Sequence, residues 1–269
     1  MTYCIGMLSE PGLVMLADTR THAGVDNIST FRKLHVWETP GERVLGLTTA
    51  GNLAISQSVR GLLREGLRFA PEDLAVMGPD APAEPDTPFT LATVPTVFQA
   101  ALLVGRAIRN VYHTDGPSLG AQDNGFQVSM ILGGQIRGRP LRLFQLYAAG
   151  NFVEATRDTP YFQIGELKYG KPILDRLMHP GIRLEEAVKL GLLSVDSTLK
   201  SNLSVGMPLD LLVYRRDDFR ITLQRRIHED DAYYHRMHDA WSRHLAEAYA
   251  GLPDPDWWEA RPDTADQPA

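Results

Sequence analysis

The chain opens on a short stretch that constrains both its fold and its chemistry. Thr2 follows Met1, and the apolar residues after it lead into Glu10-Pro11-Gly12. A second apolar run, Leu13 to Ala17, ends at Asp18. Two apolar runs separated by a Pro-Gly turn are typical of a β-hairpin. We therefore expect the second strand to bring Asp18 beside the start of the first.

The position of Thr2 gives it a chemical potential that most threonines lack. Threonine is small enough for routine removal of the initiator methionine, which would leave Thr2 with a free α-amine. The hydroxyl is then a nucleophile, and the amine can act as its base through a water. An α-amine has a pKa of about 8 and is substantially neutral at cytoplasmic pH. Because many chains carry a threonine second, this feature alone does not identify a nucleophile.

Size, charge and cysteine content exclude several classes of protein. The chain has 269 residues, 43% of them hydrophobic, and a net charge of -6. This length allows one large domain or two small ones with a substantial core. The mild acidity and the lack of a basic stripe argue against nucleic-acid binding. No apolar run approaches the roughly 18 residues of a membrane helix, and no signal peptide is recognisable. The single Cys4 forbids an internal disulfide, so we expect a soluble cytoplasmic protein.

The order of the predicted elements favours two antiparallel sheets flanked by helices. Strands are predicted at 3–9, 13–18, 31–37, 43–49, 126–133, 141–147, 152–156, 209–214 and 219–225, and helices at 52–63, 97–112, 169–178, 184–199 and 229–249. Asn52 is the expected cap of the first helix. Residues 21–30 and 70–88 are expected to be loops. Strands gathered in this way favour a sandwich over a doubly wound parallel sheet.

The C-terminal part is predicted to hold a long helix and a tail. We expect a single domain over residues 1–250 and a loose tail over 251–269, which is rich in Pro and Asp. In the helix, His235 and His238 have a spacing that suits a metal, but no cysteine cluster accompanies them, so we expect a solvated face and no metal site. A four-residue repeat predicts one buried stripe, covering either the chain's own sheet or a neighbouring subunit: Tyr233, Met237, Trp241, Leu245 and Tyr249.

Six segments, spread over most of the chain, carry a family resemblance. They are Thr2–Gly6, Ala17–Thr30, Arg32–His35, Thr48–Ala54, Tyr161–Pro172 and Ser194–Thr198. Together they resemble the proteasome β-subunit type of N-terminal-nucleophile hydrolase, and more narrowly its bacterial Anbu (ancestral β-subunit) branch. The resemblance implies an α+β fold built as a four-layer α-β-β-α sandwich. It also implies no cofactor and a homo-oligomeric ring.

The resemblance implies a role for five residues. Thr2 matches the nucleophile, and Lys33 matches the buried lysine whose ammonium favours the deprotonated form of that nucleophile. Asp18 matches the carboxylate that pairs with the lysine. Gly51 matches the glycine whose backbone N–H binds the oxyanion. Asp196 matches the aspartate that helps to organise the amine and hydroxyl of the nucleophile.

The residues themselves support some of these roles and leave alternatives open. Lys33 lies in an alternating apolar segment, where a buried lysine requires a partner such as Asp18; otherwise it is a surface lysine on an edge strand. Gly51 lies where a strand passes into a helix, a place where free N–H groups favour an anion, although a plain turn needs glycine equally. Asp196 is otherwise an ordinary aspartate of a helix end or loop.

The chain departs from the family pattern around Gly165-Glu166-Leu167. Many proteasome subunits have a serine within Gly-Ser-Gly there, and Glu166 would replace it as a partner of the amine, raising the pKa of the amine. The second family serine matches Ser197 or Ser201, with the residues between them interpreted as an insertion. Arg20 is a further supporting candidate. Only Met1 precedes Thr2, so activation is expected to need trimming by an aminopeptidase.

These inferences predict an N-terminal threonine peptidase or related amidase. It would form an acyl-enzyme on Thr2 inside a homo-oligomeric ring and act on peptides or unfolded proteins. Thr21, His22, Phe31 and Thr49 are candidates for the pocket beside the scissile bond. Two alternatives stay open: a ring-forming scaffold or binding protein with little turnover, and a hydrolase or transferase of a small peptide-like amide. No ATPase partner is indicated.

Overall fold

The computed structural model describes residues 2–22, 28–69, 71–77, 88–120 and 125–258. Contacts divide the chain into two compact units, Met1–Asp231 and Ala232–Ala269. The long C-terminal helix therefore groups with the second unit. The single domain over 1–250 and the loose tail over 251–269 stay predictions, and most of the tail lies outside the described residues.

Two antiparallel five-stranded sheets form the centre of the first unit. The first sheet has the order β10-β1-β2-β11-β12 and contains β1 (Tyr3–Ser9), β2 (Gly12–Asp18), β10 (Tyr161–Gly165), β11 (Leu209–Arg215) and β12 (Leu223–Ile227). The second has the order β5-β6-β7-β8-β9 and contains β5 (Leu34–Thr39), β6 (Arg43–Gly51), β7 (Val128–Ile136), β8 (Arg142–Leu146) and β9 (Phe152–Glu154). The predicted first hairpin is confirmed as β1 and β2, which pair from Cys4 with Ala17 to Ser9 with Gly12.

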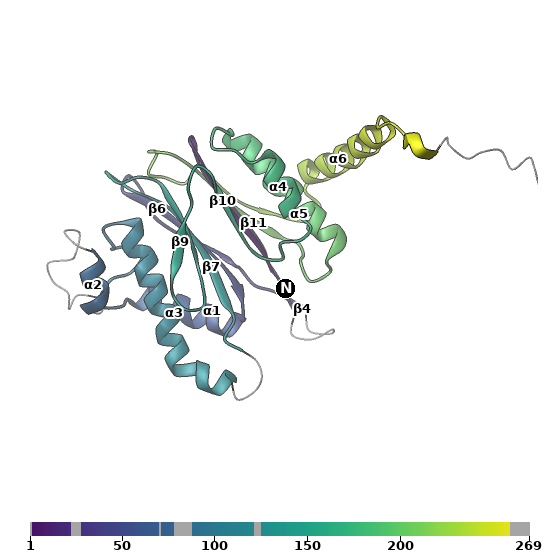
Figure 1. The fold of residues 1–269 in the computed structure, drawn as a ribbon. Helices are drawn as coiled ribbons and strands as arrows, with labels where there is room; N and C mark the ends of the chain where they lie inside the picture. Colours follow the sequence, from purple (N-terminus) through teal and green to yellow (C-terminus); the bar gives the residue numbers. More distant parts are fainter. Residues whose placement is uncertain (1, 23–27, 70, 78–87, 121–124, 259–269) are drawn as a thin grey trace, which may run out of the picture. The chain divides into compact units, whose positions relative to one another are not determined.

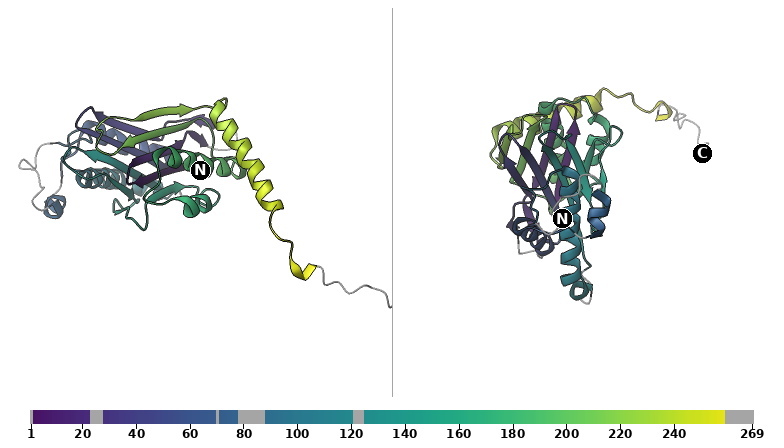
Figure 2. Two further views of the ribbon diagram at one scale, coloured as in Figure 1. Left: turned by 90° about the horizontal axis from the view of Figure 1, so that it is seen from above. Right: turned by 90° about the vertical axis from the view of Figure 1, so that its left-hand side faces the viewer.

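Helices cover the outer faces of both sheets (Figures 1 and 2). Helices α1 (Leu53–Glu65) and α3 (Val97–Gly120) pack on the second sheet, and the short α2 (Pro71–Met77) lies on the same side. Helix α5 (Leu184–Ser201) packs on the first sheet with α4 (Lys171–Leu177) beside it. The layers therefore run α-β-β-α, and the predicted four-layer sandwich is confirmed.

Apolar side chains fill the spaces between the layers. One cluster lies between the two sheets and includes Met15 of β2 and Leu143 of β8, both fully buried. A second lies between the second sheet and its helices and includes Leu47 of β6 and Val59 of α1. Full burial of such a side chain stabilises the fold by roughly 1.5–3 kcal/mol. These clusters fix the positions of the two sheets, and therefore of the ends of β2, β6 and β10, relative to each other.

The structure corrects four local predictions. Part of the predicted loop 21–30 pairs as β3 (Arg20–His22) with β4 (Ile28–Thr30), and the predicted loop 70–88 contains α2. The strand predicted from Phe31 begins at Leu34, and β10 was not predicted as a strand. These elements are three to seven residues long, too short for a periodic pattern to stand out from the surrounding polar residues.

The second unit contains α6 (Ala232–Ala250) and a 3-10 turn at Asp256–Trp258. The predicted stripe is not one buried face within this chain: its members Tyr233, Leu245 and Tyr249 are 46%, 50% and 80% exposed, although Met237 is buried. Its alternative, that the stripe covers a neighbouring subunit, stays a prediction. A helix has 3.6 residues per turn, so a strict four-residue repeat rotates by roughly 40° per step and leaves one face within a few steps. No helix in the described ranges is long and apolar enough to cross a membrane.

Candidate active site

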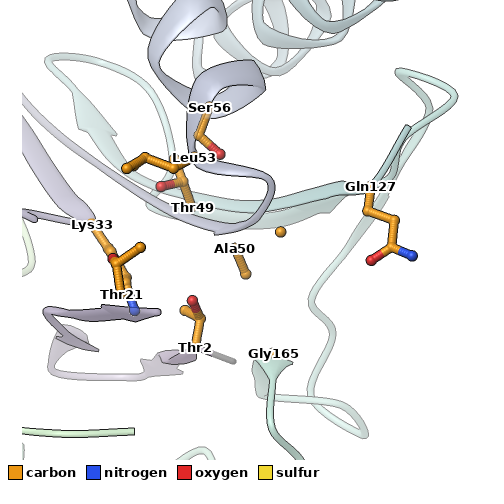
Figure 3. Close-up of a pocket in the computed structure, with 10 residues that line it drawn as sticks. Thr2, Thr21, Lys33, Thr49, Ala50, Leu53, Ser56, Gln127 and Gly165 are labelled. Carbon is orange, nitrogen blue, oxygen red and sulfur yellow. The ribbon is translucent and has the colours of Figure 1, made fainter. Parts of the chain in front are cut away.

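An open pocket of about 390 Å³ lies where the start of β1 meets the end of β6. It is lined by Thr2, Thr21, Lys33, Thr49, Ala50, Gly51, Leu53, Ser56, Gln127 and Gly165. Thr2 is 8% exposed, and Figure 3 shows its hydroxyl facing the middle of the pocket, with Ala50 opposite. Strand pairing brings these residues together, because Gly51 of β6 pairs with Val128 and Tyr3 of β1 pairs with Gly165.

Asp18, at the end of β2, connects the other predicted residues. Its side chain is fully buried, and its Oδ1 accepts hydrogen bonds from Tyr3 N–H at 2.9 Å and from Lys33 Nζ at 2.7 Å. Gly206 N–H donates to Oδ2 at 3.4 Å. Burial raises the pKa of Asp18 above its ordinary value, and the Lys33 ammonium and these backbone N–H groups oppose the increase. One carboxylate oxygen thus links Lys33 to the residue that directly follows Thr2.

Lys33 directly precedes β5 and is only 5% exposed. Besides Asp18, its Nζ donates to the carbonyl oxygen of Arg20 at 2.6 Å. Its own carbonyl accepts from Thr49 N–H at 3.0 Å, which continues the β5–β6 pairing back to this residue. The lysine is therefore buried and paired with Asp18, which excludes the alternative of a surface lysine on an edge strand. Its role in catalysis stays a prediction.

Arg20 holds the loop that completes the environment of Asp18. Its Nη1 donates to the carbonyl oxygens of Leu203 at 3.0 Å and Val205 at 3.5 Å. A Cβ atom on Gly206 would lie 2.0 Å from Nε of Arg20, so a larger residue at that position would displace the guanidinium group. Arg20 thus contacts the loop that carries Gly206 and, through its carbonyl, Lys33; its supporting role in the site stays a prediction.

Gly165 and Glu166 contact the backbone of Thr2. Glu166 N–H donates to the Thr2 carbonyl oxygen at 2.7 Å. Gly165 has a φ of +88°, and a Cβ atom there would lie 1.9 Å from the same oxygen. The Glu166 carboxylate is buried and accepts from Lys168 N–H at 2.9 Å and from Asn202 Nδ2 at 2.8 Å. Both carboxylate oxygens thus have protein donors, and the suggested partnership with the Thr2 amine stays a prediction.

Gly51 ends β6 at the edge of the pocket. Its φ of +104° and the Gln127 carbonyl oxygen, which a Cβ atom would approach to 2.4 Å, both require glycine. Asn52 then caps α1 as predicted, because its Oδ1 accepts from Ala54 N–H at 2.9 Å and Ile55 N–H at 3.5 Å. The positive end of the helix therefore lies beside the pocket, where it favours an anion. Oxyanion binding by the Gly51 N–H stays a prediction.

The remaining predicted residues lie on or beside α5 or around the pocket. Asp196 is buried on α5, Ser197 is partly buried, and Ser201 is exposed at the last position of the helix. Helix α5 is continuous through 199–200. Thr21 and Thr49 line the pocket as predicted, whereas Phe31 is 38% exposed and outside its lining, and the His22 side chain lies outside the described ones.

Five lining residues were missed from the sequence: Ala50, Leu53, Ser56, Gln127 and Gly165. Two of them had a usable signal. Leu53 and Ser56 lie three apart in the first turn of the helix that follows Gly51, and such residues share a face. Gln127 directly precedes β7, whose first residue pairs with Gly51 at the end of β6. This pairing joins segments that are far apart in sequence, so no local pattern indicates it. Among the described residues, no group of three His, Cys, Asp or Glu side chains is arranged to hold a metal ion.

No family model and no curated protein matches the chain, but solved structures do. An Anbu (Gly-1) mutant from Hyphomicrobium sp. strain MC1 is 48% identical over 95% of this chain and 100% of its own, with a TM-score of 0.82. The chain belongs to the Anbu (ancestral β-subunit) family. Anbu from Yersinia bercovieri is 43% identical over 94% of this chain and 98% of its own, with a TM-score of 0.82.

A further Anbu structure, described as the helical assembly of the Anbu complex from Pseudomonas aeruginosa, is 43% identical. The match covers 98% of this chain and 100% of that one, with a TM-score of 0.82. Membership in the Anbu family confirms the resemblance inferred from the six sequence segments. It also agrees with the observed α+β fold of two antiparallel sheets between helix layers.

Proposed function

We propose that this Anbu chain is an N-terminal threonine hydrolase of peptide or peptide-like amide bonds. One observation carries the proposal: Asp18 Oδ1 accepts from both Lys33 Nζ and Tyr3 N–H, beside a Thr2 hydroxyl that faces an open pocket. A buried ammonium next to a hydroxyl favours the alkoxide electrostatically. An ion pair that only stabilises the fold does not require an open pocket beside it, whereas a catalytic pair must lie where a substrate can enter.

The reaction begins once Met1 has been removed. The Thr2 hydroxyl attacks the carbonyl carbon of the amide, and its proton passes to the α-amine, through a water where needed. The tetrahedral intermediate then expels the leaving amine, which takes up that proton, and an ester on Thr2 remains. A water molecule attacks the ester, loses a proton to the α-amine and releases the carboxylic acid. The α-amine passes that proton to the Thr2 oxygen as the ester bond breaks, which restores Thr2.

Lys33 and Gly51 have separate tasks in this scheme. Two of the three N–H groups of the Lys33 ammonium donate to Asp18 and Arg20, which fixes its position. The third is available toward the pocket that Lys33 lines together with Thr2. The Gly51 N–H and the positive end of α1 stabilise the oxyanion, a contribution typically worth about 3–4 kcal/mol for one donor.

A scaffold with little turnover is the second candidate, and assembly is compatible with both. The relative from Pseudomonas aeruginosa is described as a helical assembly. In this chain, the second unit carries large apolar side chains that are at least half exposed: Leu245, Tyr249, Leu252 and Trp257. Exposed apolar groups of this kind favour association. We propose that the chain forms a homo-oligomer, with α6 contributing to the contacts between subunits.

The deciding experiment is the intact mass of the purified protein with and without a probe that acylates N-terminal threonines. We expect loss of Met1 and addition of one probe to each chain, with no addition to Thr2→Ala. A protein that has lost Met1 and still resists the probe would favour the scaffold. Mass spectrometry of the products then distinguishes a peptidase from an amidase of small molecules.

A further inference from the structure

A second groove, of about 610 Å³, runs between α1 and the free edge of β5. We call it the arginine groove and define it by Arg32, His35, Glu38, Gln57, Arg60 and Arg64. It adjoins the candidate active site but is separate from it. Lys33 and Ser56 line the active-site pocket, whereas their neighbours Arg32 and Gln57 line the groove.

Two of the three guanidinium groups in the groove have no acidic partner among the residues that the structure describes. Arg60 and Arg64 are one turn apart on α1 and form no ion pair with any acidic side chain in the described part of the chain. Other arginines of the fold differ in this respect: Arg43 pairs with Glu42 and Arg109 with Asp73. Unpaired guanidinium groups on one side of a concave surface attract anions.

The acids near the groove are already engaged. Asp210 lies 3.6 Å from Arg32, but both of its oxygens accept from Arg226, at 2.8 and 2.9 Å. Glu38 Oε1 accepts from the backbone N–H of Ile221 at 2.7 Å; this bond leaves the carboxylate charge in place, so Glu38 offsets one of the three guanidinium charges of the groove. The groove therefore keeps an excess of positive charge, which these carboxylates reduce only in part.

The surroundings of His35 show the same excess of positive charge. Arg60 Nη1 lies 3.4 and 3.5 Å from its two ring nitrogens. Burial lowers the pKa of His35 to about 4, and the charges of Arg60 and then Arg32 add to this effect, while Asp210 opposes it. The Arg60 guanidinium thus lies against the His35 ring, and the charge of Arg32, from a separate segment, acts on the same ring.

We propose that the arginine groove binds a small anion with two or more phosphate or carboxylate groups. A guanidinium group matches both oxyanions with two parallel hydrogen bonds. Arg60 and Arg64, spaced by one helical turn, offer two such forks, and Arg32 and the Gln57 amide extend the set from the same groove. A single small anion would neutralise only part of this charge, which favours a polyanion.

The test is isothermal titration calorimetry of the full chain with inorganic triphosphate and, separately, with citrate. We expect saturable binding of at least one, with one site per chain; the preferred anion identifies the phosphate or carboxylate source. Arg64→Glu, on an exposed position, should raise the Kd at least about tenfold, and Arg60→Gln should do likewise, since a charge-assisted hydrogen bond is worth enough for a tenfold change.

Two controls make the result specific to the groove. Arg176→Glu, on an exposed position of α4, changes the net charge equally and should leave the Kd unchanged. Thr2→Ala should also bind normally, because the groove does not depend on the threonine chemistry. Absence of saturable binding by both anions, or an equal loss in Arg176→Glu, would overturn the proposal. So would binding of an acidic peptide in the groove when neither small anion binds.

Discussion

Replacing Asp18 with alanine would remove the acceptor on which three donors converge. The side chains of Lys33 and Asp18 are 6% and 0% exposed, so the buried lysine would lose its carboxylate partner and keep the Arg20 carbonyl oxygen as an acceptor. Loss of one member of such a pair costs about 3–5 kcal/mol. We expect the free energy of unfolding to fall by at least about 3 kcal/mol, or roughly 6–20 °C in Tm for a chain of this size.

The chain contains a matched control for this variant. Lys171 and Asp175 on α4 form the same kind of pair at 2.6 Å, against 2.7 Å for Lys33 and Asp18, but both side chains are 49% exposed. Because exposed pairs contribute at most about 1 kcal/mol, Asp175→Ala should be nearly neutral.

Urea unfolding of Asp18→Ala, Asp175→Ala and the wild type, under the same conditions, measures the difference. The double variant Asp18→Ala with Lys33→Met should recover part of the lost stability, since it removes the unpaired charge. Equal small losses in Asp18→Ala and Asp175→Ala, or no recovery in the double variant, would refute the reasoning from burial.

Four further predictions concern chemistry, pH and assembly. Thr2→Ala should abolish probe labelling and hydrolysis while circular dichroism stays unchanged; unchanged turnover would eliminate threonine catalysis. Lys33→Ala should lower the rate by about 10²–10⁴-fold in a peptide or amide assay. The pKa of His35 is about 4 in the folded protein, lowered from 6.5. Protonation of the unfolded chain therefore lowers the free energy of unfolding by about 3 kcal/mol as the pH falls from 6.5 to about 4, and this part of the stability is complete above pH 6.5. Urea unfolding at pH 7 and pH 4 should therefore show a smaller loss for His35→Asn than for the wild type, and an equal loss would contradict the assignment. Leu245→Glu with Tyr249→Glu should reduce the particle mass seen by light scattering, and a monomeric but active wild type would contradict assembly.

Much of the candidate site could be predicted because its parts are short and local. The Pro-Gly turn between two apolar runs placed Asp18 beside the start of β1, and the pairing of Cys4 with Ala17 confirms that register. Asn52 after a strand predicted the cap of α1, which its two hydrogen bonds confirm. In each case the residues that decide the geometry are close in sequence, so the signal is complete within one segment.

Other features depended on segments that meet only after folding. The Gly206 N–H reaches Asp18 from a position 188 residues away, and Gly165 is required only because its backbone meets the Thr2 carbonyl. The sequence left open what covers the stripe on α6, because a four-residue repeat indicates which side chains align and not which surface packs against them. The arginine groove has the same origin, since Arg32 and Arg60 share it only through the packing of α1 beside β5.

The amino-acid sequence by itself determined the order of most elements, the first hairpin and the chemical types gathered near Thr2, while β3, β4, β10 and α2 were missed. Periodicity, turn residues and caps act over a few residues, and the chain carries that information directly. The tertiary structure alone decided which charged side chains are buried away from solvent. Lys33 and Arg60 are both cations of the first sixty residues, yet one is buried against Asp18 and the other lines a groove and has no acidic partner in the described part of the chain. A side chain is buried when other segments pack against it, and those segments are often distant in the sequence.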